Sequence, residues 1–243
     1  MNRQAQAAVL FLVGGAVLRA SFTDLYLRYV KAGLRPLLLV AGIVLIVAAI
    51  ATVWYELRQP RTTQANQPER EPDGRGHAHR EPRISWLLVL PLFALILVAP
   101  PALGSYSATR TGTALQKPWG FPSLPAGDPL QLSVVDYAGR AVYDHGRSLA
   151  ERRIRITGFV TLDRNGAPYL TRMVLNCCAA DAQPVKIGLT GRIPSVMQPD
   201  SWLEVTGTYT TKQTKDPVND GAIPFINISR ARPVAAPHNQ YEE

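Results

Sequence analysis

The stretch RIRITGFVTLDRNGAPYL, residues 153–170, decides the fold of the C-terminal half of this chain. Alternating residues such as Ile154 and Ile156 place apolar side chains on one face of an extended segment and arginine and threonine on the other, which is typical of a half-buried strand. Asn165-Gly166 accepts the positive φ angles of a tight hairpin turn. The stretch therefore predicts two antiparallel strands, the second of which returns from Tyr169 to Cys178.

Three more short runs follow the same alternating pattern, and each is bounded by turn residues. Gly207 interrupts the second of them, where we expect a bend or bulge. The residues that mark the three runs are Val185, Ile187 and Leu189, then Leu203, Val205 and Tyr209, and finally the segment from Phe225 to Arg230. Five short strands within roughly 80 residues favour a small OB-like five-stranded barrel, with a small sandwich as the alternative.

The predicted barrel domain spans residues 128–235 and is followed by a tail at 236–243. Asp128-Pro129 resembles a helix N-cap followed by a proline at the first helical position, so a leading helix from Leu130 to Tyr143 is expected. The alternation of apolar residues at the start of this segment is also compatible with a short strand.

The N-terminal part, residues 1–104, contains three long apolar runs. The clearest run, 37–54, has eighteen residues without a charge, which at about 1.5 Å per residue nearly crosses a roughly 30 Å hydrocarbon core. The run at 84–104 predicts another span. The first run lacks a clear cleavage site for a signal peptide and predicts a tilted span over 7–27. The sequence therefore predicts a mainly helical, multi-pass anchor in the cell membrane, with three transmembrane helices.

Two polar segments separate these parts. Residues 58–83 are rich in proline, glycine and charge and predict a disordered linker. Residues 105–127 predict an irregular linker that lifts the folded domain off the membrane. With three spans, the side that carries the N-terminus and the 58–83 loop has seven lysine and arginine residues against five on the other side. By the positive-inside rule, the C-terminal domain is then extracytoplasmic.

The net charge of +8 does not indicate nucleic-acid binding. Most of the excess, +5, lies in residues 1–104, whereas the remainder of the chain carries +3. A barrel that binds single strands needs exposed aromatic residues and a basic groove. The mild charge of the folded domain and its expected extracytoplasmic location argue against nucleic acid as a partner.

Cys177 and Cys178 are the only cysteines, and they are adjacent. Consecutive Cα atoms are about 3.8 Å apart, below the usual disulfide range, so a vicinal disulfide would need a strained backbone. On a regular strand the two side chains would point to opposite faces, with Cys177 toward the core. Three interpretations stay open: the pair and Asp181 or a distant His145 bind a soft metal ion such as zinc or copper, the pair is a redox switch, or it has no special chemistry.

Other chemical motifs are sparse. His77 and His79 form a His-x-His pair in the polar loop and are weaker candidate metal ligands, because no cysteine or third histidine lies near them in the sequence. The sequence contains no phosphate loop, dinucleotide fingerprint or nucleophile motif. We therefore do not expect an enzyme, and no catalytic residue or organic cofactor is predicted.

Three segments resemble the YcgQ-like family of bacterial membrane proteins: RIRITGFV (153–160), LNCCAADAQPVKIGL (175–189) and WLEVTGTY (202–209). The Cys-Cys-x-Ala-Asp-x-x-Pro core, from Cys177 to Pro184, is the most specific match, and the resemblance covers nearly the whole chain. It implies a permease subunit whose partner is a multi-spanning permease in the same lipid bilayer. It assigns no residue roles, because the biochemical activity of the family is not established.

The combined expectation is an accessory transport subunit whose outer OB-like domain covers or regulates the transporter. The alternative that rests on the residues alone is a membrane-anchored metal-binding or thiol-redox module.

Overall fold

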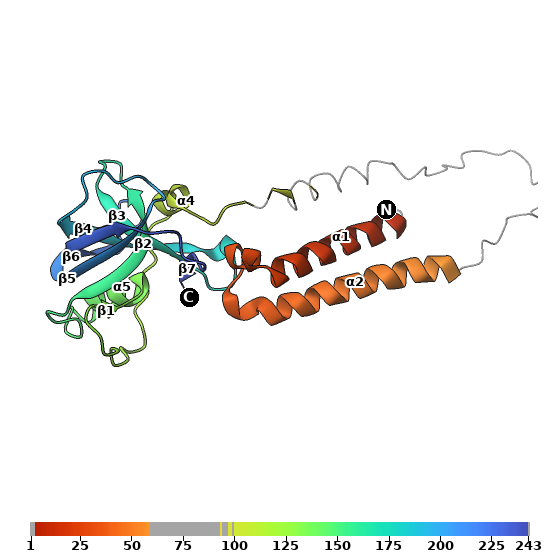
Figure 1. Ribbon diagram of the computed structural model, residues 1–243, viewed down its shortest axis with the longest axis horizontal. Helices are drawn as coiled ribbons and strands as arrows, with labels where there is room; N and C mark the ends of the chain where they lie inside the picture. Colours follow the sequence, from red (N-terminus) through yellow and green to blue (C-terminus); the bar gives the residue numbers. More distant parts are fainter. Residues whose placement is uncertain (1–2, 59–92, 94–96, 99, 243) are drawn as a thin grey trace, which may run out of the picture. The chain divides into compact units, whose positions relative to one another are not determined.

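The computed structural model describes residues 3–58, 93, 97–98 and 100–242 (Figure 1). The chain divides into two compact units: the first comprises Met1–Asp24 and Gly33–Pro100, and the second Leu25–Ala32 and Pro101–Glu243. Most of the predicted linker at 58–83 and of the predicted third span at 84–104 lies outside the described residues.

Two helices form the described part of the first unit: α1 (Arg3–Phe22) and α2 (Arg35–Arg58). Both are long and apolar enough to cross a membrane. The predicted span at 37–54 lies within α2, whereas the prediction that the first span continues over 7–27 is wrong, because α1 ends at Phe22. The residues after it form a 3-10 helix, Asp24–Arg28, and most of that segment belongs to the second unit.

Small residues allow α1 and α2 to approach closely. A Cβ atom at Gly42 would lie 2.7 Å from the side chain of Leu18, and one at Gly14 would lie 3.0 Å from Cβ of Leu45. Small residues at such crossings are typical of helix pairs in membranes, where lipid provides no hydrophobic drive for association. Elsewhere on α2, large apolar side chains are exposed, among them Val44 at 59 %. Such a surface needs lipid or another protein to cover it.

Five strands of the second unit form a closed barrel, as predicted. Neighbouring strands are antiparallel except β4 and β6, which are parallel, and pairing of β2 with β3 closes the sheet in the order β2–β5–β6–β4–β3. This is the strand count and closure of an OB-like barrel. The barrel strands are β2 (Ile154–Leu162), β3 (Pro168–Val174), β4 (Gln183–Gly191), β5 (Trp202–Lys215) and β6 (Ala222–Pro233).

Two local predictions are confirmed in the barrel. The β2–β3 turn has Gly166 at a φ of 78°, and the Asp163 carboxylate accepts hydrogen bonds from the backbone N–H groups of Asn165 and Ala167. The register of β5 against β6 shifts between Thr206 and Gly207, which is the expected bulge.

The segment before the barrel contains both a strand and a helix. β1 (Leu130–Gln131) pairs with β2, and α5 (Val134–Tyr143) follows it. The predicted N-cap at Asp128-Pro129 is wrong, because the Ser133 hydroxyl caps α5 by accepting the N–H of Asp136. The alternation at the start of this segment therefore marked a real strand, and the helix begins four residues later than predicted.

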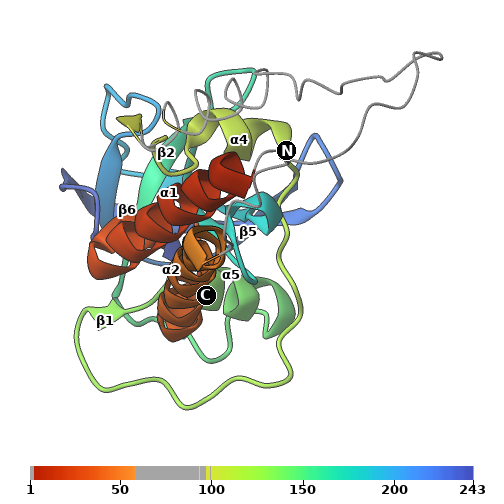
Figure 2. The same ribbon diagram turned by 90° about the vertical axis from the view of Figure 1, so that its right-hand side faces the viewer.

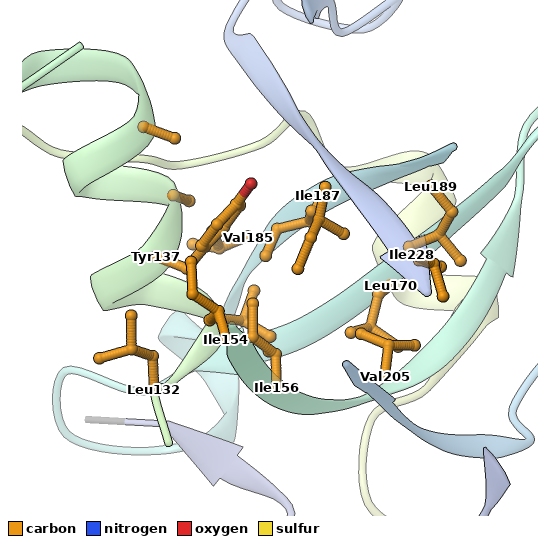
Figure 3. Close-up of a cluster of buried hydrophobic side chains, with 14 of the residues drawn as sticks. Leu132, Tyr137, Ile154, Ile156, Leu170, Val185, Ile187, Leu189, Val205 and Ile228 are labelled. Atoms are coloured by element: carbon orange, nitrogen blue, oxygen red, sulfur yellow. The ribbon is translucent and has the colours of Figure 1, made fainter. Parts of the chain in front are cut away.

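Helix α5 lies beside the barrel strands (Figure 1). It contacts all five of them and supplies apolar side chains to the core inside the barrel. Tyr137 is fully buried, and its hydroxyl donates a 2.6 Å hydrogen bond to the carbonyl of Phe225. Figure 3 shows Tyr137 from the helix side and Ile154, Ile187 and Ile228 from the strands directed into one cluster. The apolar residues that alternate along the predicted strands thus face this core, as predicted.

The chain segments at both ends of the barrel domain are more ordered than predicted. Within 105–127, Ser105–Arg110 forms the short helix α4, and the rest runs around the domain to β1 (Figure 2). Within the predicted tail, Tyr241–Glu242 forms β7, which pairs with the end of β3. Sequence periodicity could not show this, because both segments are held by tertiary contacts rather than by an alternating apolar face.

Candidate metal and thiol site

The adjacent cysteines lie in a loop and not on a strand. β3 ends at Val174, and the segment after Leu175 turns away from the sheet into a short 3-10 helix at Ala179–Asp181. The prediction that the return strand continues to Cys178 is therefore wrong. The prediction that Cys177 points into the core is wrong for the same reason: Cys177 is exposed and Cys178 is half-buried.

Asp181 shapes this loop. Its carboxylate accepts hydrogen bonds from the backbone N–H of Asn176 at 3.1 Å and from that of Cys177 at 2.9 Å. The N–H of Asp181 in turn donates to the carbonyl of Cys178 at 3.1 Å. These bonds fold the loop so that side chains which would diverge on a strand face the same carboxylate.

The three side chains converge. Within the part of the chain that the structure describes, Cys177, Cys178 and Asp181 form a group whose two sulfur atoms and carboxylate oxygen all lie within 4.8 Å of one another. Both cysteines are thiols rather than a disulfide. Hydrogen bonding to the Asp181 carboxylate, followed by that to Cys178, raises the pKa of Cys177 to about 11. The same thiol hydrogen bond lowers the pKa of Asp181.

This geometry suits a borderline or soft cation. Two Zn–S bonds of about 2.3 Å at a tetrahedral angle place the sulfur atoms roughly 3.8 Å apart, and the two sulfur atoms of the loop lie within 4.8 Å of each other. Two thiolates and one carboxylate would supply three ligands and leave a fourth position for water or another ligand. Metal binding would replace the thiol protons and would keep Asp181 in contact with both cysteines.

The connection between α1 and α2 forms part of this site. Val30 and Cys178 form an antiparallel bridge, and the carbonyl of Tyr29 accepts the N–H of Ala179 at 2.7 Å. The carbonyl of Cys177 accepts the N–H of Lys31 at 3.1 Å. The backbone on both sides of the two candidate ligands is therefore fixed by residues from the start of the chain.

The remaining candidate ligands are not part of this group. His145 follows α5 in a left-handed conformation, with a φ of 51°, and the described Cys177–Cys178–Asp181 group does not include it. His77 and His79 lie outside the described residues. Of the two alternatives for a further ligand, Asp181 lies beside the cysteines and His145 is not part of the group; that these residues bind a metal stays a prediction.

Sequence reasoning missed a buried ion pair elsewhere in the domain. Lys186 on β4 donates to the Asp216 carboxylate at 2.7 Å and to the carbonyl of Thr111 at 3.1 Å. Asp216 also accepts the N–H groups of Thr113 and Val218. Both charged residues are buried, at 5 % and 0 % exposure. The only sequence signal was a lysine between two apolar strand residues, which is equally typical of an outward-facing position.

It also missed the role of the C-terminus. The Glu242 carboxylate accepts the first two N–H groups of α5, from Val134 and Val135, each at 2.9 Å, and lies 3.4 Å from Arg172. Burial raises the pKa of Glu242 and lowers that of Arg172. A glutamate next to the end of a chain carries no sequence signal for such a role.

Residues 128–242 match the family model of the DUF1980 C-terminal domain. The matched range holds the barrel, the Cys177–Cys178–Asp181 group and Glu242, and it ends with β7. Comparison with curated proteins and with solved structures found no match. Residues 128–242 are therefore similar to the DUF1980 C-terminal domain, while the resemblance of the chain to YcgQ-like permease subunits stays a prediction.

Proposed function

We propose that this protein is a membrane-tethered accessory subunit of a permease, with its OB-like barrel outside the cytoplasm at the mouth of the transporter. The observation that carries the proposal is that residues 25–32, between the two apolar helices, are built into the barrel unit. A barrel held in this way follows the helices wherever they dock. The resemblance to YcgQ-like proteins supports a permease as the membrane partner.

The same connection supports a topology with three crossings. If α1 and α2 both cross the membrane, the connection at 25–32 emerges on one side, and the barrel lies on that side because Val30 pairs with Cys178. The chain then leaves α2 at Arg58 on the opposite side. One more crossing between residues 59 and 100 must bring it back. The part of the predicted apolar run before Pro101 is the segment that fits, because residues from Pro101 onward belong to the barrel unit. The arginine-rich loop is then cytoplasmic.

Cysteine accessibility tests this topology in intact cells. In a C177S/C178S background, Asn165→Cys at the exposed β2–β3 turn is expected to react with a membrane-impermeant maleimide without lysis. Thr62→Cys in the arginine-rich loop is expected to react only after the membrane is permeabilised. The reverse pattern, or equal labelling of both, would contradict the proposed topology.

Co-purification tests the partner. We expect N-terminally tagged protein, extracted in mild detergent, to recover a multi-spanning permease of the type paired with YcgQ-like proteins in near-stoichiometric amounts. An unrelated tagged membrane protein, extracted in parallel, should not recover it. A protein that is consistently solitary, in detergents that preserve other membrane complexes, would rule out the accessory role.

We propose, as a second candidate function, that the outer domain binds a soft or borderline cation such as Zn²⁺ through Cys177, Cys178 and Asp181. The convergence of their ligand atoms within 4.8 Å favours it. The exposure of Cys177 gives an ion a route to the site from solution. A redox switch would use the same sulfur atoms, but it has no use for the Asp181 carboxylate beside them, which would be a third ligand in a metal site.

Metal titration of the full chain tests this candidate. Protein purified without a polyhistidine tag is expected to bind about one equivalent of Co²⁺ with a sulfur-to-cobalt charge-transfer band, and to release it on addition of Zn²⁺. C177S/C178S should lose the band, whereas H145Q, which removes the histidine left out of the group, should keep it. Equal metal content in wild type and C177S/C178S would end this proposal.

A further inference from the structure

Three arginines gather on the outer face of the barrel, away from the cysteine loop in the sequence. Arg155 on β2 is paired in register with Thr206 on β5, and Thr206 is paired with Arg230 on β6. Two residues before Thr206, on the same face of β5, Glu204 is paired with Arg232 on β6. Alternating positions of three adjacent strands thus place three guanidinium groups, one hydroxyl and one carboxylate on the same patch of surface.

These five residues line a small cavity of about 120 Å³. Glu204 does not neutralise it, since three arginines and one glutamate leave an excess of two positive charges. Glu204 accepts a 2.8 Å hydrogen bond from Nε of Arg232 and lies 3.8 Å from Nε of Arg155. All three arginines contribute to lowering the pKa of Glu204, chiefly through the Arg232 hydrogen bond, as expected for groups that face one carboxylate.

Donors in this cavity are left without protein acceptors. Nε of Arg155 is buried and has no hydrogen-bond partner among the described residues. Arg230 is exposed, and no hydrogen bond joins its side chain to a residue that the structure describes. A buried donor without an acceptor is costly, so such a group in a native protein calls for a missing partner. An anion in the cavity would supply the acceptor that the Nε of Arg155 lacks and would offset the excess of positive charge.

We propose that the cavity lined by Arg155, Arg230, Arg232 and Thr206 binds a phosphate-type oxyanion. Planar guanidinium groups form paired, charge-assisted hydrogen bonds with phosphate oxygens, and a tetrahedral anion can engage two strands at once. A charge of about −2 balances the excess that Glu204 leaves. The cavity is too small for a large polyanion to enter, so it would hold a single phosphate group, either free or as the head of a membrane lipid.

The test uses full-length protein in a neutral detergent and follows the arginine Nε–Hε resonances by NMR. Titration with inorganic phosphate is expected to shift the Arg155 resonance in a saturable way, while chloride at equal ionic strength is not. R155Q/R230Q, followed through the Nε–Hε resonance of the remaining Arg232, should weaken phosphate binding at least about tenfold, because each charge-assisted hydrogen bond contributes on the order of 1.5–3 kcal/mol. R164Q/R192Q removes two exposed arginines elsewhere on the domain and should leave the affinity unchanged.

A second titration separates the two sources of phosphate. If short-chain phosphatidylglycerol, kept below its micelle concentration, shifts Arg155 and competes with inorganic phosphate, a lipid headgroup is the ligand. If only inorganic phosphate does so, the ligand is a free phosphate. The proposal is overturned if neither shifts Arg155, or if R164Q/R192Q weakens binding as much as R155Q/R230Q, since the effect would then reflect overall charge alone.

Discussion

Lys186→Met is expected to destabilise the barrel domain by about 3–5 kcal/mol. The substitution keeps most of the side-chain volume but leaves the carboxylate of Asp216, which is fully buried, without its cation. The cost is that of an uncompensated buried charge. For a domain of this size we expect the apparent unfolding midpoint, followed by near-UV circular dichroism in detergent, to fall by on the order of 10 °C.

A double-mutant cycle isolates the pair. K186M/D216N removes both charges, so this double variant should lose less stability than the two single variants lose together. Arg153 and Asp128 form the matched control, because their ion pair is similarly short, 2.6 Å against 2.7 Å, but lies on the surface with both side chains about 60 % exposed. R153M should shift the midpoint little, since water screens exposed pairs. If R153M lowers the unfolding midpoint as much as K186M does, burial of the ion pair is not the cause of the destabilisation.

Glu242→Ala is expected to destabilise the domain by about 3 kcal/mol, measured in the same way. The change removes the acceptor for the first two N–H groups of α5 and the anion beside Arg172, whose side chain is 9 % exposed. Glu242→Gln should cost less, because the amide oxygen can still accept one of these bonds. If E242A unfolds at the wild-type midpoint, the carboxylate does not hold α5 in place.

The Glu242 carboxyl also predicts a pH dependence. Its pKa is raised above the ordinary value of 4.5 in the folded protein, so the folded state binds this proton more readily than the unfolded state does. As pH falls from neutral through the raised pKa toward 4.5, wild type should therefore gain stability relative to E242Q, which cannot titrate there. A constant difference between the two proteins over this range would contradict the shift. The comparison with E242Q cancels the titration of other carboxyls.

The barrel was predictable because its strands follow a rule that depends only on neighbouring residues. Ile154 and Ile156 had to face a core, and Asn165-Gly166 had to turn, whatever the rest of the chain did. The candidate metal ligands could be named by residue type, since thiols and carboxylates are the side chains that bind soft or borderline cations. The positions of these side chains could not be predicted, because the rule that side chains alternate between two faces applies only on a strand. Here β3 has already ended, and hydrogen bonds from the backbone N–H groups of Asn176 and Cys177 to the Asp181 carboxylate fold the segment.

Contacts between distant segments were beyond sequence reasoning. The span predicted to reach Leu27 failed because backbone bonds to the cysteine loop favour a different structure for residues 25–32 than continued helix. Lys186 and Asp216 had no visible relation, because their pairing depends on how β4 and the β5–β6 turn meet in three dimensions. In each case the deciding partner comes from another part of the chain and leaves no periodic trace.

The position of β7 has a consequence for the order in which the domain assembles. The Tyr241 hydroxyl accepts the N–H of Leu103 and donates to the carbonyl of Arg28, and the Glu242 carboxylate accepts the first N–H groups of α5. Two adjacent residues therefore join three segments that are far apart in the chain. Contacts of such long sequence separation need large loops to close before they form, so we expect them to be made late in folding.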